Sequence, residues 1–205
     1  MPNGYLCFIL HAHLPYIRHP EFPEFIEERW LYEAVRESYL PLLRVLRARR
    51  ERPSASRLTV SLSPTLMAML DDPLLRQRCE RHLERLVKLA DRQVERTTND
   101  PHSPWLPMAR FYQVLSEENL ATWRGLGEGG LVDALVDLEQ RGHIELITTC
   151  ATHAFLPIWK RHPEVTRRQI MVGVRAFERR IGHPPAGMWL PECGYYPGLE
   201  KYLEE

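Results

Sequence analysis

The sequence predicts an α/β protein in which short parallel strands alternate with helices. Four apolar runs have the length of strands, and most are too uniformly apolar to leave one face in water. Helical patterns separate these runs, as in a succession of βαβ units. The 205 residues contain no internal repeat, low-complexity tract or linker, so we expect one domain, or part of a larger one.

The predicted strands are few for a closed barrel. They span residues 5–10, 58–62, 144–148 and 187–190. A standard β/α barrel needs about eight strands. We therefore expect either a small open sheet or the first part of a larger barrel, and the helix-like pattern of residues 198–205 favours the second.

Helical spacing fills the intervals between the strands. The pattern predicts helices over 31–50, 63–96, 131–142 and 163–182. We expect a break near Pro73 and helix ends at Gly142 and Gly182, where glycine can adopt the left-handed conformation of a C-cap. The stretch 97–130 begins loop-like and becomes helical. In the first helix the predicted apolar face consists of Leu31, Val35, Leu42, Leu43 and Leu46.

Charge and cysteine content exclude several classes. Lys+Arg and Asp+Glu both number 27, so the net charge is zero, which argues against general electrostatic binding to nucleic acid or acidic membranes. The four cysteines show neither zinc-type spacing nor a small disulfide framework. Neither a signal peptide nor a membrane span is visible, and we expect a cytoplasmic protein.

Polar side chains follow three of the four predicted strands. His11 and His13 come after the first, His153 after the third, and Glu192 and Tyr195 after the fourth. The carboxyl ends of parallel strands meet on one face of a β/α fold, where active sites are built. We therefore expect these residues to converge on one site.

The histidines allow two interpretations. We expect His11 and His13 to point to opposite faces if the strand continues through both, which leaves one of them as a hydrogen-bonded core residue. His-x-His is also a metal-ligand pair, and His153 could supply a third ligand. Taken alone, His153 fits a packed or hydrogen-bonded histidine better than a ligand.

Glu192 also allows two interpretations. An acid after proline can favour the start of a helix through the helix dipole. A carboxylate held by Pro191 and flanked by aromatic rings can instead act as a nucleophile or general base. The rings of Trp189 and Tyr195 suit stacking on a sugar, although such residues are also ordinary in cores and clefts.

Three segments together resemble a known family. "FILHAHLPY", "GHIELITTCATHAFLP" and "GMWLPECGY" look like the first three conserved regions of glycoside hydrolase family 57, in the right order. Within that family the chain is most similar to 1,4-α-glucan branching enzymes. The resemblance implies the N-terminal part of an incomplete (β/α)7 barrel and a retaining reaction on α-1,4-glucan, without cofactor or metal.

The resemblance also implies roles for individual residues. Glu192 matches the catalytic nucleophile of the third region. The substrate-binding positions would be His11, His13, His153, Trp189 and Tyr195. The family's acid/base Asp lies in a fourth region further along, and no residue here matches it. We therefore expect residues 1–205 to be the N-terminal part of one catalytic barrel domain, inactive alone.

Other functions remain open at this point. Within the family, α-amylase and 4-α-glucanotransferase share the same motifs. A metal-dependent polysaccharide deacetylase would bind zinc through His11, His13 and His153, with Glu192 as base. A glycan-binding module would bind glucan without chemistry, and would keep its affinity after Glu192→Gln.

Overall fold

The structure is a computed structural model that describes residues 4–49 and 57–205. The chain forms two compact units. The first contains residues 4–16, 57–69 and 135–205 of the described chain, and the second contains residues 17–49 and 70–134.

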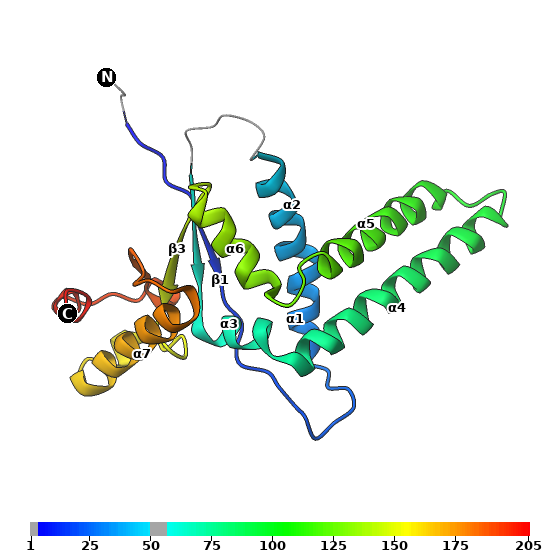
Figure 1. The fold of residues 1–205 in the computed structure, drawn as a ribbon. Helices are drawn as coiled ribbons and strands as arrows, with labels where there is room; N and C mark the ends of the chain where they lie inside the picture. The colour runs from blue at the N-terminus through cyan, green and yellow to red at the C-terminus, as the bar shows by residue number, and fades with distance from the viewer. Residues whose placement is uncertain (1–3, 50–56) are drawn as a thin grey trace. The chain divides into compact units, whose positions relative to one another are not determined.

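A four-stranded parallel sheet forms the centre of the first unit, as predicted. Its strands are β1 (Ile9–Ala12), β2 (Leu58–Leu62), β3 (Ile144–Thr149) and β4 (Met188–Trp189), in the order β1-β2-β3-β4. Figure 1 labels β1 and β3. The chain order equals the spatial order, because each crossover returns to the next position in the sheet. All four strands therefore present their carboxyl ends at the same edge.

The first strand differs from its prediction. It begins at Ile9 rather than at residue 5 and continues through His11, because pairing with β2 runs from Ile9–Thr59 to Ala12–Leu62. The expectation that this strand is covered on both faces is also wrong. Tyr5 is 95% exposed, and the apolar residues that follow it up to Leu10 are exposed as well.

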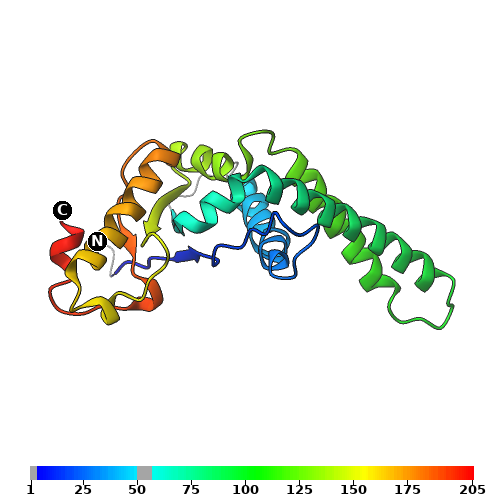
Figure 2. The same ribbon diagram turned by 90° about the horizontal axis from the view of Figure 1, so that it is seen from below.

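Helix α7 (Pro163–Ile181) packs against β3 in the first unit (Figure 2). Phe177 on this helix is fully buried. At Gly173 a Cβ atom would lie 2.4 Å from the backbone oxygen of Thr149, so only glycine allows the helix to approach the strand this closely. The helix ends as predicted, with Gly182 at φ 99°.

Short elements complete the first unit. The 3₁₀ turns η2 (Leu156–Trp159) and η3 (Pro191–Cys193) follow β3 and β4, and helix α8 (Glu200–Leu203) packs against α7. A small core lies beneath them, made of Cys150, Leu156, Ile170, Tyr196 and Leu199. This core anchors the loops that carry His153 and Glu192.

The predicted helix break near Pro73 is confirmed. Helix α3 (Pro64–Asp71) ends there, and α4 (Pro73–Thr98) begins. Asp72 caps α4, since its carboxylate accepts a hydrogen bond from Leu75 N at 3.0 Å. The Gly142 prediction also holds: α6 (Gly130–Gln140) stops just before that residue, which has φ 75°.

The second unit is helical. Helix α4 lies along α5 (Leu106–Arg124) in both views of the ribbon (Figures 1 and 2). The predicted helix over 31–50 consists of α1 (Glu28–Ala34), a π-helical turn (Val35–Tyr39) and α2 (Leu40–Arg49). No helix within the described part of the chain is long and apolar enough to cross a membrane.

Candidate active site

The predicted convergence occurs in the first unit, at the carboxyl edge of the sheet. His11 is the third residue of β1, and His13 follows that strand directly. His153 lies in the loop after β3, and Glu192 lies in the turn after β4. Four side chains from three separate segments therefore come together.

The three imidazole rings form one contiguous stack. His11 Nε2 lies 2.8 Å from His153 Nε2. The ring centroids of His13 and His153 lie 3.8 Å apart, with 8° between the ring planes. The expectation that His11 and His13 point to opposite faces is wrong. Residues two positions apart on an extended chain share a face, so both histidines reach His153.

Trp189 closes the stack on the side of β4. The centroid of its ring lies 5.5 Å from the centroid of the His11 ring, and the two ring planes are inclined by 21°. The side chain of Thr149 fixes the strand end, because its hydroxyl donates to the backbone oxygen of Trp189 at 2.7 Å. An aromatic face therefore borders the three imidazoles.

Two serines that the sequence analysis did not single out hold the histidines. Ser61 Oγ lies 3.1 Å from His11 Nδ1, and Ser63 Oγ lies 3.0 Å from His13 Nδ1. Ser61 is fully buried inside β2, which is an apolar run. A polar residue in such a run was the available signal, since a buried hydroxyl needs a partner. Ser63 is the first residue of the helix predicted over 63–96, a position where serine is ordinary.

The hydrogen bonds assign the proton on two of the three rings. Ser61 donates its hydroxyl proton to the backbone oxygen of Thr148 at 3.3 Å, so it accepts from His11 Nδ1–H. Neutral His11 then accepts at Nε2 from His153 Nε2–H. The remaining nitrogen, His153 Nδ1, lies on the side of Glu192.

Burial keeps these rings neutral. Desolvation, with a smaller contribution from the neighbouring His153, lowers the pKa of His11 from 6.5 to about 4. Desolvation likewise lowers the pKa of His13 to about 4. Burial also lowers the pKa of His153, against the opposing influence of Glu192. Neutral imidazoles can both donate and accept hydrogen bonds, which suits contact with sugar hydroxyls.

Glu192 presents a solvent-accessible carboxylate beside the histidines. Its side chain is 73% exposed, and Oε1 lies 3.8 Å from His153 Nδ1. The interpretation that Glu192 starts a helix is not supported: the turn η3 is only three residues long, and α8 begins at Glu200. The side chain is free to meet a ligand.

The backbone at the site is held in an uncommon conformation. Glu192 and Cys193 have φ values of 53° and 55°, and His153 has φ 57°. These left-handed conformations are unfavourable for residues with a Cβ atom and often mark functional sites. The turn is kept in place by buried Pro191 and by a hydrogen bond from Cys193 N to the oxygen of Leu190 at 2.9 Å.

Tyr195 does not join the cluster in this structure. Its side chain is 56% exposed, and its hydroxyl donates to Glu200 Oε2 at 3.1 Å. The neighbouring Tyr196 is buried in the core of the first unit. Of the predicted site residues, the structure therefore brings together His11, His13, His153, Trp189 and Glu192.

The geometry does not resemble a preformed metal site. The ring nitrogens of His11 and His153 hydrogen-bond to each other, and the other nitrogens of His11 and His13 bond to serines. Over residues 4–49 and 57–205, no group of three or more His, Cys, Asp or Glu side chains is placed to hold a metal ion. The arrangement instead offers hydrogen bonds and one free carboxylate.

Known proteins are similar to this chain in sequence and fold. The chain is 32% identical to the 1,4-alpha-glucan branching enzyme TK1436 of Thermococcus kodakarensis, over 99% of this chain and 31% of that enzyme. The crystal structure of the alpha-amylase AmyC from Thermotoga maritima is 43% identical, with a TM-score of 0.88, and the match covers 97% of this chain and 37% of that one. The GH57-type branching enzyme from Pyrococcus horikoshii is 34% identical, with a TM-score of 0.84, and the match covers 95% of this chain and 36% of that one.

The matches cover nearly all of this chain but only part of each relative. The chain spans about a third of the length of each of these relatives. The description of glycosyl hydrolase family 57 matches residues 7–205, which is nearly the whole chain. The sequence resemblance is therefore confirmed, and this chain belongs to glycosyl hydrolase family 57.

Proposed function

We propose that this chain supplies the nucleophile and part of the sugar-binding site of a retaining enzyme that acts on α-1,4-glucans, as a 1,4-α-glucan branching enzyme. One observation carries the proposal: the carboxylate of Glu192 is exposed on a strained turn, 3.8 Å from His153, beside stacked imidazoles and Trp189. A branching enzyme is favoured because relatives with that name match over nearly the whole chain.

The proposed reaction has two steps. Glu192 Oε attacks the anomeric carbon of an α-1,4-linked glucosyl unit, the bond to the leaving oxygen breaks, and a glycosyl-enzyme forms. A second carboxyl group protonates the leaving oxygen and later takes the proton of the acceptor hydroxyl. In branching, that acceptor is a 6-hydroxyl of another glucan chain.

The histidines and Trp189 orient the sugar in this proposal. The neutral imidazoles exchange hydrogen bonds with the hydroxyls of the glucosyl unit bound at Glu192. The indole ring of Trp189 packs against the apolar C–H face of a pyranose. Tyr195, which contacts Glu200, would join the site by breaking that single exposed hydrogen bond.

We propose that the second carboxyl group lies outside residues 1–205, so that this chain is the N-terminal part of one catalytic domain. The relatives are about three times longer, which leaves room for it. In a retaining pair the two carboxyl groups lie about 5–5.5 Å apart. Without that group, residues 1–205 would bind glucan but would not cleave it.

A second function is favoured by a specific observation. The crystal structure that is 43% identical to this chain belongs to a protein called an alpha-amylase. The same nucleophile would then transfer the glycosyl group to water. A 4-α-glucanotransferase would differ only in using a 4-hydroxyl as acceptor. The zinc-dependent deacetylase gains no support, because both nitrogens of His11, Nδ1 of His13 and Nε2 of His153 already form hydrogen bonds to one another or to serines.

The test is an activity assay, with amylose as substrate, of the protein that is expressed from the full open reading frame encoding this chain. We expect new α-1,6 linkages in the NMR spectrum of the product, and a loss of at least about 10³-fold in rate with Glu192→Gln. Glu164→Gln is the matched control, since Glu164 is an exposed carboxylate on α7. That variant should retain full activity.

Each outcome decides between the proposals. Reducing sugar released without branches would move the assignment to a hydrolase. Equal activity of Glu192→Gln and the native protein would remove Glu192 from the chemistry. Activity of residues 1–205 alone would overturn the placement of the second carboxyl group outside this chain.

A further inference from the structure

The second unit contains a cavity of ≈ 480 Å³ whose lining has more basic than acidic side chains. It lies between helix α1, helix α4 and the loop that precedes α1. Five cationic and three acidic side chains line it. Its volume falls within the range of small-molecule sites, which is about 300–1,000 Å³.

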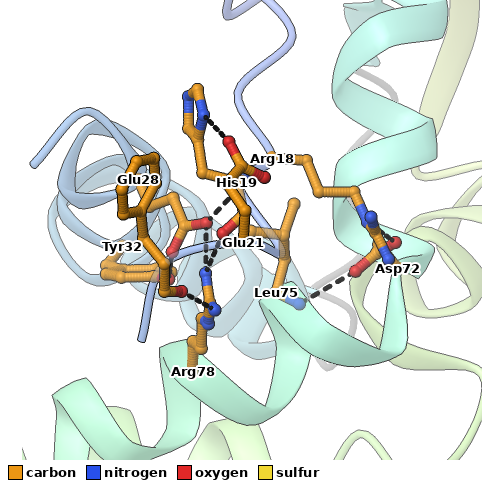
Figure 3. Close-up of polar contacts among 9 residues, drawn as sticks. Arg18, His19, Glu21, Glu28, Tyr32, Asp72, Leu75 and Arg78 are labelled. Carbon is orange, nitrogen blue, oxygen red and sulfur yellow. Dashed lines mark hydrogen bonds and ion pairs between the residues drawn. The ribbon is translucent and has the colours of Figure 1, made fainter. Parts of the chain in front are cut away.

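The floor of the cavity is a closed polar network. Arg78 donates to Glu28 Oε1 at 2.5 Å, and the Tyr32 hydroxyl donates to Glu28 Oε2 at 2.9 Å (Figure 3). The side chains of Arg78 and Glu28 are only 7% and 1% exposed. Both charges are therefore balanced within the floor, although Arg78 Nε has no hydrogen-bond partner.

The other two acids of the cavity are also paired. Glu24 forms an ion pair with Arg85, which also lines the cavity. Glu84 forms an ion pair with Arg124, which lies on α5. All three carboxylates that line the cavity are thus already neutralised by a partner.

Three cations of the lining have no such partner. Among the described residues, Arg29, Arg81 and Lys88 form no ion pair within 4.0 Å. Arg29 comes from α1, and the other two come from α4, so the positive charges face the cavity from two elements. A concave site with uncompensated charges from two sides favours an anionic ligand.

We propose that this cavity binds a phosphate monoester, with its phosphate group held by Arg29, Arg81 and Lys88. A phosphate monoester carries a charge close to −2 near pH 7 and presents three strong acceptor oxygens. Guanidinium groups match that geometry with two parallel N–H donors. This site is separate from Glu192 and does not rest on the proposed glucan chemistry.

One side of the cavity suits an organic substituent. Pro23, Phe25 and Ile26 line it from the loop before α1, and Ile26 is 70% exposed. Apolar groups beside charged ones are typical of sites for small organic molecules. The ester's organic part would pack on these side chains, whereas free phosphate would not need them.

The test uses titration calorimetry to measure ligand binding to the protein that is expressed from the full open reading frame encoding this chain. The probes are glucose 1-phosphate, inorganic phosphate and glucose. We expect saturable binding of glucose 1-phosphate with a dissociation constant of about 1 mM or lower, and none of glucose at this site. Charge reversal by Arg81→Glu or Lys88→Glu should weaken the phosphate ligand at least about tenfold.

The matched control is Arg110→Glu. Arg110 is an exposed arginine on α5 that does not line this cavity, and it has no ion pair among the described residues. This variant should bind glucose 1-phosphate as the native protein does. Arg81, Lys88 and Arg110 are all exposed, so the three variants should fold, and their unfolding midpoints check this.

The outcomes separate the sources of phosphate. Tighter binding of glucose 1-phosphate than of inorganic phosphate supports an organic ester, and equal affinity supports recognition of the phosphate group alone. The proposal is overturned if neither probe saturates below roughly 10 mM. It is also overturned if Arg110→Glu weakens binding as much as Arg81→Glu does. Loss of glucan activity by Glu192→Gln bears on neither result.

Discussion

His11, His13 and His153 show how neighbouring residues change one another's chemistry. Each ring is partly buried, and each lies against another imidazole, so a proton on one ring raises the cost of a proton on the next. The serines on β2 and just after it fix which nitrogen faces the ligand. The result is a set of oriented neutral donors and acceptors near pH 7.

This neutrality predicts acid sensitivity. The pKa of His11 and of His13 falls from 6.5 to about 4 on folding, so between these pH values the unfolded chain binds more protons. Stability is then fully present above about pH 6.5 and declines as pH falls toward about 4. The double variant His11→Gln/His13→Gln should lose part of this decline, measured as the urea midpoint between pH 8 and 4.

A control isolates the effect. His102 is exposed and lies in the loop between α4 and α5, so His102→Gln should leave the pH profile unchanged. His82 also has a lowered pKa and lies apart from these rings, so it retains its contribution in both variants. An unchanged slope in the double variant would contradict the protonation states assigned to the site.

At this scale the sequence predicted which residues meet but not how they are held. His11, His13, His153 and Glu192 could be placed together because they follow strands that the pattern predicts to be parallel. The left-handed φ of His153 and Glu192 could not be predicted, because nothing in the local sequence favours it over an ordinary turn. It depends on the core beneath the loops.

Among the elements, the contact between α7 and β3 depends on one missing side chain. Gly173→Ala would place a Cβ atom 2.4 Å from the backbone oxygen of Thr149, and backbone cannot move aside as a flexible side chain can. We expect a loss of about 1–3 kcal/mol in the free energy of unfolding, from overpacking. Chemical denaturation measures this loss.

Gly187→Ala is the matched comparison. The nearest atom to its added Cβ is Ile147 Cγ2 at 3.7 Å, which is ordinary contact. This substitution should change the unfolding free energy by less than about 0.5 kcal/mol. Equal effects at the two positions would show that Gly173 is not required for the approach of α7 to β3.

The helices were predicted well because periodicity is a strong local signal, and the exception has a clear cause. Of the predicted apolar face of the first helix, Leu31, Val35, Leu43 and Leu46 are buried, whereas Leu42 is only half-buried and Leu40 is buried in its place. The Leu40 N–H bonds to the oxygen of Val35, five residues back, in the π-helical turn. A π-helical turn contains one residue more than an α-helical turn, so Leu40 turns toward the buried face, which regular α-helical spacing cannot predict.

Within the described residues, β1 is an open edge of the sheet. In the order β1-β2-β3-β4, the first strand pairs on one side only within the described residues. The residues before it, among them Tyr5, Leu6 and Phe8, are largely exposed. Unpaired backbone groups beside exposed apolar side chains are a template for association.

We therefore expect residues 1–205, expressed as an isolated polypeptide, to self-associate at about 100 µM. The variant Leu6→Lys/Phe8→Lys should reduce this association, because charge on an edge opposes pairing between copies. Sedimentation velocity measures it. Val172→Lys is the control, since Val172 is exposed on α7 instead. A monomeric native chain at this concentration would contradict the prediction.

At the scale of the whole molecule, the alternation of strands and helices was predicted correctly. The division of the chain into two compact units was not predicted. The sequence shows no linker. The chain passes from the first unit to the second and back twice, because the second unit is built from two separate segments, residues 17–49 and 70–134. Only contacts distant in sequence reveal such a division. The basic cavity was missed for the same reason, since its charges come from α1 and α4, far apart in a chain whose net charge is zero.

The turn that carries Glu192 has a consequence for how natural variation should be interpreted. Cys193 shares the left-handed conformation, and no chemistry in the proposed reaction uses its thiol. Glycine, asparagine and aspartate adopt this conformation readily, whereas β-branched residues do so rarely. Narrow variation at position 193 among homologues would thus reflect the geometry that the neighbouring carboxylate requires, and would not identify a reacting group.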